Sequence, residues 1–366
     1  MQIAPLESWV AGYSKPLVIT GPCSVESPQQ FHDTLQQLLP LQPHFIRGGI
    51  WKPRTRPGSF EGIGAKALDW VNREKQDNPF HFATEVATPE HAELALASGA
   101  NLLWIGARTT VNPFQVQQIA DAVAGKDVAV FVKNPINPDL ALWRGAIERF
   151  AKAGITKLGA IHRGFHVHHP SRFRNEPLWQ IPLDLKSELP GLPLICDPSH
   201  ITGKRDMIFE IAQRALDLNF DGLMIESHCQ PDEALSDAAQ QVTPEALANI
   251  FQSLTLRSGS FSEDLVRSQL EVIREEIDRA DHDIIEALAK RLNLVEQIGS
   301  YKKENNVAIF QLSRWKEIFK SRPQWAKSLD LDEEFIRDLY RLIHQQSVKR
   351  QTTVFNKKDQ QADHNE

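Results

Sequence analysis

Residues 47–62 read RGGIWKPRTRPGSFEG and carry four cations, Arg47, Lys52, Arg54 and Arg56, in a protein whose formal net charge is −6. Runs of charge are commonly solvated surface. Here glycines and prolines accompany the cations, and these residues favour a backbone of defined shape. A defined loop with several cations suits a small anion, above all a phosphate. The pattern therefore predicts an anion-binding loop.

A second group combines one thiol, one imidazole and two carboxylates: Cys23, His200, Glu226 and Asp237. Mixed sulfur, nitrogen and oxygen ligands suit a borderline divalent metal ion. The paired CxxC spacing of a structural zinc site is absent from the sequence. Each residue also has a plainer role open to it, as a packed thiol, a turn cap or a solvated carboxylate. The rival hypothesis is a nucleophilic enzyme that pairs Cys23 with His200 or His228.

The composition is that of a globular protein of one large domain and one smaller domain, with 366 residues, 41% of them hydrophobic and 24% charged. No apolar run has the length of a membrane helix. A pI of about 6.1 gives no support for general nucleic-acid binding. The N-terminal residues MQIAPLESWV lack a signal sequence, which favours the cytoplasm. Three cysteines cannot all pair within one chain, so thiols, metal ligands or nucleophiles are expected.

Eight short apolar runs recur along the first 255 residues, with helical patterns or helix-start residues between most of them. The runs span residues 17–20, 45–50, 80–86, 101–107, 128–133, 157–162, 192–196 and 222–227. Alternating strands and helices imply parallel strands with helical crossovers. Eight such units in roughly 240 residues fit an α/β fold of the (β/α)8 TIM-barrel type. An open doubly wound sheet is the alternative, although no GxGxxG follows the first run. Residues 171–189 read as irregular.

In such barrels the chemistry lies on the loops that follow the strands. Every expected strand end delivers a polar or reactive side chain: Cys23; Arg47, Lys52 and Arg54; Glu85; Arg108; Lys133; His162 and Arg163; Asp197 and His200; Glu226 and His228. The cations exceed the needs of one phosphate, which predicts two phosphorylated ligands, or a phosphate and a carboxylate. Some cations are alternatively ion-paired with barrel carboxylates such as Glu85.

Nine segments carry a resemblance to a known family: GPCSVES, FIRGGIWKPRTRPGSFEG, ATEVATPEH, IGART, VKNP, HRGF, DPSH, IESH and ALSDAAQ. In this order they resemble the type I beta branch of the 3-deoxy-D-arabino-heptulosonate 7-phosphate (DAHP) synthases, over roughly residues 15–255. The resemblance implies condensation of phosphoenolpyruvate with erythrose 4-phosphate, the first step of the shikimate pathway. A KDO 8-phosphate synthase is the less favoured alternative, because that family differs at KPRT.

The resemblance also implies roles for individual residues. A divalent ion, Mn²⁺ first and Fe²⁺, Co²⁺ or Zn²⁺ as alternatives, would be bound by Cys23, His200, Glu226 and Asp237. Phosphoenolpyruvate would be held by Arg108, Lys133 and Arg163, with Arg47, Lys52 and Ala107 nearby. The phosphate of erythrose 4-phosphate would be held by Arg54 and Thr55. The candidates for moving a proton or positioning water are Lys52, Glu85 and His200.

After the barrel, which we place at residues 1–255, the pattern changes. Residues 256–262 read as a linker, and residues 263–355 as a helical domain that ends in a disordered tail, 356–366. Its first helix, of about 40 residues and hence about 60 Å, is too long to bury its apolar stripe within one small domain. We therefore expect it to pack against another chain or domain. Two further helices are expected near 313–327 and 332–352.

The polar residues of this domain resemble the pattern of the all-helical (AroQ-type) chorismate mutases: Arg274, Arg291, Lys302, Arg314, Ser347 and Gln351. The resemblance implies rearrangement of chorismate to prephenate, with arginines on the carboxylates and Lys302 and Gln351 on the ether oxygen. It also implies a homodimer whose subunits share the sites. Gln311 and Trp315 replace an Asp and a Glu of that family, which predicts weaker turnover. The fusion suggests that prephenate inhibits the synthase. The alternative is a helical arm that only dimerises or binds an effector.

Overall fold

The computed structural model describes residues 1–53, 58–257 and 264–357, and for residues 264–269 the backbone alone. The chain divides into two compact units, Met1–Gly259 and Ser260–Glu366, which are taken in turn. Most of the expected linker and of the expected tail lies outside the described residues. No described helix is both long enough and apolar enough to span a membrane.

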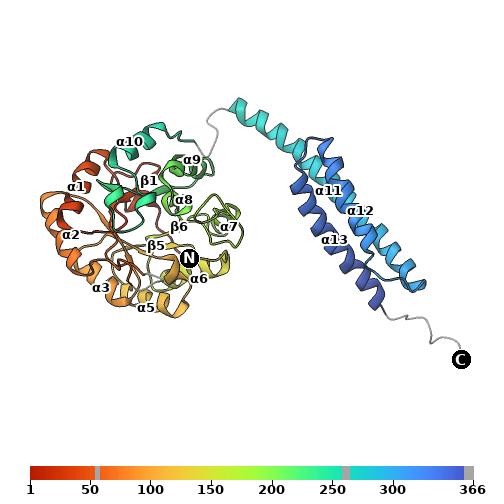
Figure 1. Ribbon diagram of the computed structural model, residues 1–366, viewed down its shortest axis with the longest axis horizontal. Helices are drawn as coiled ribbons and strands as arrows, with labels where there is room; N and C mark the ends of the chain where they lie inside the picture. Colours follow the sequence, from red (N-terminus) through yellow and green to blue (C-terminus); the bar gives the residue numbers. More distant parts are fainter. Residues whose placement is uncertain (54–57, 258–263, 358–366) are drawn as a thin grey trace. The chain divides into compact units, whose positions relative to one another are not determined.

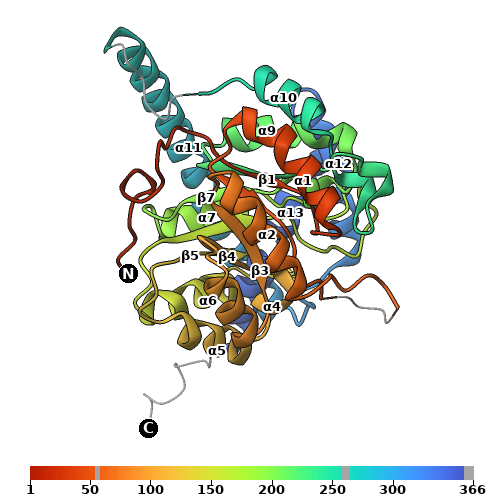
Figure 2. The same cartoon turned by 90° about the vertical axis from the view of Figure 1, so that its left-hand side faces the viewer.

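Eight parallel strands of the first unit close into a barrel in chain order, with the helices around them (Figures 1 and 2). The predicted TIM barrel is therefore confirmed. The strands are β1 Leu17–Gly21, β2 Phe45–Arg47, β3 Phe82–Val86, β4 Leu102–Ile105, β5 Ala129–Lys133, β6 Leu158–His162, β7 Leu194–Cys196 and β8 Gly222–Glu226. Closure pairs β1 with β8, Leu17 opposite Gly222. Each strand begins within two residues of its predicted apolar run.

Local sequence explains where many of the helices begin. Ser27, Thr88, Asn112, Asp139 and Thr243 are N-caps whose side chains accept a hydrogen bond from a backbone N–H of the first turn. The helices are α1 Pro28–Leu38, α2 Lys66–Asp77, α3 Pro89–Ala97, α4 Ala107–Thr110, α5 Pro113–Val123, α6 Leu140–Lys152, α7 Gln180–Glu188, α8 Pro198–Thr202, α9 Ile208–Asp217 and α10 Pro244–Ser253. Several of them place proline at the first position, where its missing N–H costs nothing.

The segment expected to be irregular, 171–189, contains helix α7 instead. Its proline, Pro182, lies in the first turn, where backbone N–H groups have no partner within the helix. Pro182 and Leu185 are buried, so tertiary packing supports a helix with little sequence pattern of its own. The prediction was wrong here, because a helix supported by tertiary packing does not need a clear apolar periodicity in its sequence.

Two apolar layers hold the barrel together. The larger layer lies between strands and helices, and the smaller fills the interior with Ile19, Phe131 and Met224 among others. The N-terminal segment adds Leu6 and Val10 to the interior layer. The barrel is thus packed from one end, which leaves the carboxyl ends of the strands to form a site.

The second unit consists of three helices, α11 Asp264–Glu304, α12 Leu312–Lys327 and α13 Glu333–Asn356 (Figure 1). Helix α13 packs against both α11 and α12. The helical region and its long first helix are as predicted. Large apolar side chains of α11 stay exposed, among them Ile273, Ile277, Ile284 and Ile285, each more than half exposed.

Candidate active sites

Side chains from five neighbouring strand ends line a cavity of about 270 Å³ at the carboxyl end of the barrel. Three of the predicted cations line it together with other predicted residues: Glu85 on β3, Ala107 and Arg108 after β4, Lys133 on β5, Arg163 after β6 and His200 after β7. Gly106 permits this packing, because a Cβ there would lie 2.1 Å from Glu85 Oε1. The lining is strongly cationic, as an anion site requires.

Lys133 is held at the cavity wall by a buried carboxylate. Its Nζ lies 2.7 Å from Asp197 Oδ2, and His200 Nδ1 lies 2.9 Å from the same oxygen. Burial alone would raise the pKa of Asp197, but His200 and Lys133 hold it well below its usual range. Asp197 is therefore ionised, and it holds both the Lys133 ammonium and the His200 ring in position.

Among the described residues, Arg163 is fixed by neutral partners rather than by a carboxylate. Its backbone N–H donates to Asn134 Oδ1 and its Nη1 to Asn175 Oδ1, both at 2.7 Å. Burial lowers the pKa of Arg163 to about 10, and the group stays charged at neutral pH. Since amide partners leave the positive charge uncompensated, Arg163 is suited to bind an anion. Arg108, which is exposed, adds a second guanidinium to the cavity.

Arg47 is placed differently from the other cations. It is 1% exposed, its Nη2 lies 3.0 Å from Glu226 Oε1, and its guanidinium lies over the ring of Trp104 at 4.9 Å. Its Nε and Nη1 are buried and have no hydrogen-bond partner within the described chain. Arg47 thus pairs with a carboxylate at the end of β8 and does not line the cavity.

The four predicted metal ligands come from the ends of the adjacent strands β7, β8 and β1. They lie as two pairs, Cys23 Sγ 3.5 Å from Asp237 Oδ2, and His200 Nδ1 3.9 Å from Glu226 Oε1. Lys52 Nζ donates to Cys23 Sγ at 3.0 Å. Burial and then Glu226 raise the pKa of the Cys23 thiol to about 12, so a divalent ion must displace its proton to bind there.

These residues fit a divalent metal ion by two observations. The buried Glu226 Oε1 lies 3.0 Å from Arg47 Nη2 but accepts no well-aligned hydrogen bond within the described chain, so it can still bind an ion. An imidazole held by a carboxylate at Nδ1, as His200 is by Asp197, is the usual arrangement of a metal-binding histidine. The nucleophile hypothesis fits less well, because within the described chain Cys23 Sγ forms hydrogen bonds with Lys52 and Asp237 and not with a histidine.

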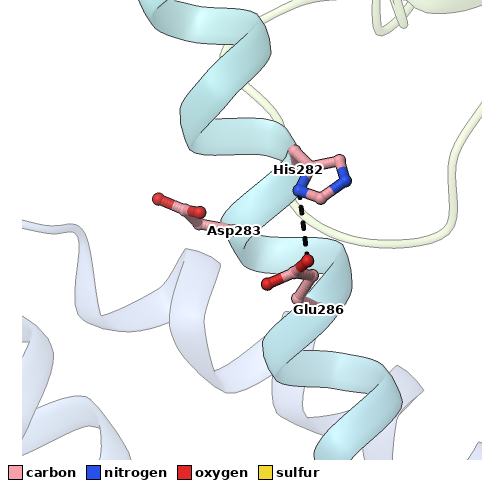
Figure 3. A group of neighbouring side chains, drawn as sticks. All are labelled: His282, Asp283 and Glu286. Atoms are coloured by element: carbon pink, nitrogen blue, oxygen red, sulfur yellow. Dashed lines mark ion pairs between the residues drawn. The ribbon is translucent and has the colours of Figure 1, made fainter.

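A different group of donors lies on the second unit. His282, Asp283 and Glu286 of α11 have ligand atoms within 4.8 Å of one another, and His282 Nδ1 lies 3.5 Å from Glu286 Oε1 (Figure 3). All three side chains are exposed. Exposed acidic groups at helical spacing commonly form such clusters without binding an ion, and no other feature marks this one as a site.

Two residues of the barrel site were missed in the sequence, Arg174 and Asn175. Both line the cavity. Arg174 Nη1 lies 3.0 Å from Asp237 Oδ1, and Asn175 Nδ2 donates to the His200 carbonyl at 2.6 Å. Gly203 leaves room for Arg174, since a Cβ there would lie 2.6 Å from the Cβ of Arg174. The signal available in the sequence was an arginine, Arg174, within the segment that read as irregular, where a cation could have been assigned to the site.

Other predicted residues lie away from the cavity or outside the described chain. The His162 ring packs among Trp143, Phe165, Trp179 and Phe220 in the outer layer, so the end of β6 supplies Arg163 to the site but not His162. His228 accepts a hydrogen bond from the backbone N–H of Gln230. Arg54, Thr55 and Arg56 lie outside the described residues.

The helical unit has its own cavity, of about 540 Å³. Five of the predicted residues line it: Arg291, Lys302, Arg314, Ser347 and Gln351. Arg291 Nη1 donates to Ser347 Oγ at 2.7 Å, and Lys302 Nζ donates to the Ile309 carbonyl at 2.6 Å. Arg274 is exposed on α11 and is not part of this lining. Gln311 and Trp315 do line it, and none of the described residues that line it is acidic.

Family models match each unit separately. Residues 2–257 match the DAHP synthetase I family, which is well over half of the chain. The chain belongs to the DAHP synthetase I family. Residues 273–352 match chorismate mutase type II, so this DAHP synthase also carries a chorismate mutase domain. The two domains provide the first step of the shikimate pathway and the rearrangement of chorismate.

Curated relatives agree with this division. A phospho-2-dehydro-3-deoxyheptonate aldolase of Thermotoga maritima is 29% identical over 237 residues, which cover 65% of this chain and 68% of that protein. A bifunctional chorismate mutase/prephenate dehydratase of Buchnera aphidicola is 36% identical over 90 residues, 25% of this chain and 23% of that protein. A 2-dehydro-3-deoxyphosphooctonate aldolase of Rhodopseudomonas palustris is 26% identical over 265 residues, 66% of this chain and 89% of that protein.

Among solved structures, the DAHP synthase of Thermotoga maritima superposes with a TM-score of 0.60 at 24% identity, over 69% of this chain and 72% of that one. At this identity the match supports the barrel fold alone. Enzymes of the type I family are generally metal-dependent, which agrees with the donor set at the ends of β7, β8 and β1.

Proposed function

We propose that the cationic cavity of the barrel binds phosphoenolpyruvate through Lys133, Arg163 and Arg108, and that erythrose 4-phosphate binds beside it through Arg54 and Thr55. The observation that carries this proposal is that several cations line one cavity. One of them, Arg163, has no carboxylate partner among the described residues. A trianionic substrate needs several such donors. Arg47, Lys52 and the backbone at Ala107 complete the proposed environment.

The condensation requires the protein to position the two substrates, and it does not require a covalent enzyme nucleophile. The enol carbon of phosphoenolpyruvate is itself nucleophilic, so the protein must hold this carbon against the aldehyde of the second substrate. Water then adds at C2 of phosphoenolpyruvate and phosphate leaves, and the cations stabilise the departing charge. Lys52, Glu85 and His200 are the groups within this region that can move a proton or position the water.

We assign Cys23, His200, Glu226 and Asp237 as the ligands of a divalent ion, with Mn²⁺ the preferred ion and Fe²⁺, Co²⁺ and Zn²⁺ as alternatives. When bound, such an ion supplies polarisation or orientation of the aldehyde oxygen. The ligand set favours borderline ions, because it mixes thiolate, imidazole and carboxylate. Asp197 supports the set by holding the His200 ring.

The test is consumption of phosphoenolpyruvate with erythrose 4-phosphate, before chelation, after chelation and after Mn²⁺ is restored. We expect activity to be lost and then recovered, and Cys23→Ala to resist recovery. Activity that persists in chelator, with metal shown absent by elemental analysis, would remove the metal assignment and leave the synthase. Turnover with arabinose 5-phosphate in place of erythrose 4-phosphate would favour the KDO 8-phosphate alternative.

For the helical domain we propose that Arg291, Lys302, Arg314, Ser347 and Gln351 bind chorismate. Arginines suit its carboxylates, and Lys302 with Gln351 stabilises charge on the ether oxygen in the transition state. Arg274 lies outside the pocket of its own chain. We therefore propose a homodimer in which Arg274 completes the partner's site, supported by the exposed isoleucines of α11.

Complementation tests the shared site. Arg274→Ala and Arg291→Ala homodimers should each lose mutase turnover. A heterodimer that carries one variant on each chain has one site with both changes and one intact site. Random subunit exchange should therefore restore about one quarter of wild-type activity. No recovery, although exchange is demonstrated, would rule out the shared site. A helical arm without mutase turnover in the wild type is the alternative function.

A further inference from the structure

The helical pocket includes a cation that the family pattern does not contain, Arg322 on α12. Arg314, Ile318 and Arg322 line the pocket at intervals of four residues, so one face of α12 is directed to it. With a rise of about 1.5 Å per residue, Arg314 and Arg322 lie about 12 Å apart along the helix. The two arginines therefore serve different parts of the pocket.

The other cations show which part Arg322 serves. Lys302 lies where α11 ends, and its Nζ contacts the Ile309 carbonyl in the connection to α12. Arg291 is eleven residues earlier on α11, about 16 Å away along the helix. Burial lowers the pKa of Arg291, and the charges of Arg322 and of Arg314 lower it further, whereas Tyr340 raises it. Because Lys302 lies at the turn into α12, Arg291 on α11 and Arg322 on α12 both line the part of the pocket away from that turn.

Arg322 is fixed in place without a carboxylate partner among the described residues. Its guanidinium lies over the Trp325 ring at 4.4 Å, and Nη1 donates to Ser321 Oγ at 2.8 Å. Its Nε is buried and has no hydrogen-bond partner in the part of the chain that the structure describes. Stacking on an aromatic ring holds a guanidinium without using its charge on an acid. A buried donor without a partner is costly unless a ligand satisfies it.

The charge of the residues that line the pocket also favours an anionic ligand. The pocket is lined by Arg291, Lys302, Arg314 and Arg322 and by no acidic residue. The position where the family has a glutamate is Trp315, which also lines the pocket. Neighbouring guanidiniums repel one another, and a bound carboxylate removes that cost while accepting hydrogen bonds from both.

We propose that Arg322 is a further substrate-binding residue of the mutase, which together with Arg291 holds one carboxylate of the dicarboxylate substrate. The inference rests on the mutase function of this domain and adds a residue to it. Since the contact is made to a carboxylate that does not react, it stabilises the bound substrate and the transition state alike. Its loss should therefore raise KM more than it lowers kcat.

The experiment uses the full-length protein and chorismate turnover. Arg322→Gln keeps a polar side chain and removes the charge. We expect KM for chorismate to rise about tenfold, or about 1.4 kcal/mol, with kcat changed less than about threefold. Arg322→Lys should recover part of the loss. The control is Arg341→Gln on α13, an exposed arginine that pairs with Asp338, which should leave both constants unchanged. DAHP formation by the same preparations checks that each variant is folded.

Two results would overturn the inference. A KM within twofold of the wild type would show that Arg322 does not bind substrate, and the function of the domain would stand. A lower melting temperature with unchanged KM would reduce Arg322 to a packing partner of Trp325. If the wild-type protein itself has no mutase turnover, the proposed function of the domain fails, and this is seen before any variant is compared.

Discussion

Lys133 and Asp197 show how a single buried pair fixes the site. The pair is almost wholly buried, at 2.7 Å. Removal of one partner leaves a buried charge uncompensated, so Asp197→Asn should lower the free energy of unfolding by about 3 kcal/mol. Asparagine keeps the capping ability of Asp197 at α8, which isolates the loss of charge. Denaturant unfolding measures the change.

Asp217→Asn is the matched control, since Asp217 pairs with Arg257 at the same 2.7 Å distance but on an exposed surface. Exposed pairs contribute less than about 1 kcal/mol. Equal losses in the two variants would contradict the view that burial determines the value of the Lys133 pair.

His162 makes stability depend on pH. Burial lowers its pKa from 6.5 to about 3. The native state holds the ring neutral, while the unfolded state takes up a proton as the pH falls below about 6.5. The contribution of His162 is therefore full above pH 6.5 and is lost between about pH 6.5 and 3, by about 2 kcal/mol at pH 5. The His162→Phe variant should lack this contribution to the fall in the free energy of unfolding between pH 7 and pH 5.

Unfolding of the wild type and of His162→Phe at both pH values gives the comparison. His168→Gln, on an exposed loop, should retain the wild-type slope. Parallel slopes for the wild type and His162→Phe would mean that the ring is protonated in the folded barrel, and the assignment of a neutral core histidine would be wrong.

At the scale of elements, the sequence predicted those features that each strand end carries by itself. Lys133, Arg163 and Glu226 follow apolar runs, and parallel closure of the barrel is enough to bring them together. Arg174 depends instead on Asp237, which is 63 residues away, and on the space at Gly203. The role of Arg322 could not be predicted without knowing which face of α12 lines the pocket. These contacts are set by tertiary packing, which no local pattern encodes.

The loop after β2 is an element whose glycines position a catalytic candidate. A Cβ on Gly49 would lie 2.4 Å from the Cys23 carbonyl oxygen and 2.7 Å from Lys52 Cε and Nζ. The flexible Lys52 side chain can move away from the added Cβ. The Cys23 backbone can move away only if the loop that carries the thiol moves with it. Displacement of reacting groups by about 1 Å costs about 100-fold in rate, and we expect Gly49→Ala to lose about that much DAHP formation.

Gly145→Ala is the control for Gly49→Ala. Gly145 lies within α6, and a Cβ there meets nothing within 4 Å. This variant should keep full activity and gain about 0.5–1 kcal/mol of stability, because alanine favours the helix. Steady-state kinetics and circular dichroism of both variants decide the point: a folded Gly49→Ala with wild-type kcat/KM would show that the loop tolerates the extra atom.

The whole molecule joins the first enzyme of a pathway to a later one, and each unit has its own cationic cavity. A product of the second unit that lowers the rate of the first gives the chain feedback control. We expect prephenate to inhibit DAHP formation by binding the helical pocket, because it is a dicarboxylate like chorismate. Arg291→Ala, which removes a guanidinium bonded to Ser347, should abolish the inhibition and leave the uninhibited synthase rate unchanged.

The variant also separates two routes by which an anion could inhibit. Inhibition that survives Arg291→Ala and is overcome by phosphoenolpyruvate would mean that prephenate competes directly in the barrel cavity, whose lining is itself cationic. Inhibition that disappears with Arg291, but persists in Arg341→Gln, requires that the state of the helical domain changes the barrel. Where the inhibition consists of weaker binding of phosphoenolpyruvate, reciprocity requires that phosphoenolpyruvate weakens prephenate binding by the factor by which prephenate weakens its own, which calorimetry of the full-length protein measures. If saturating prephenate leaves the rate of DAHP formation by the wild-type protein unchanged, the fusion does not have this regulatory role.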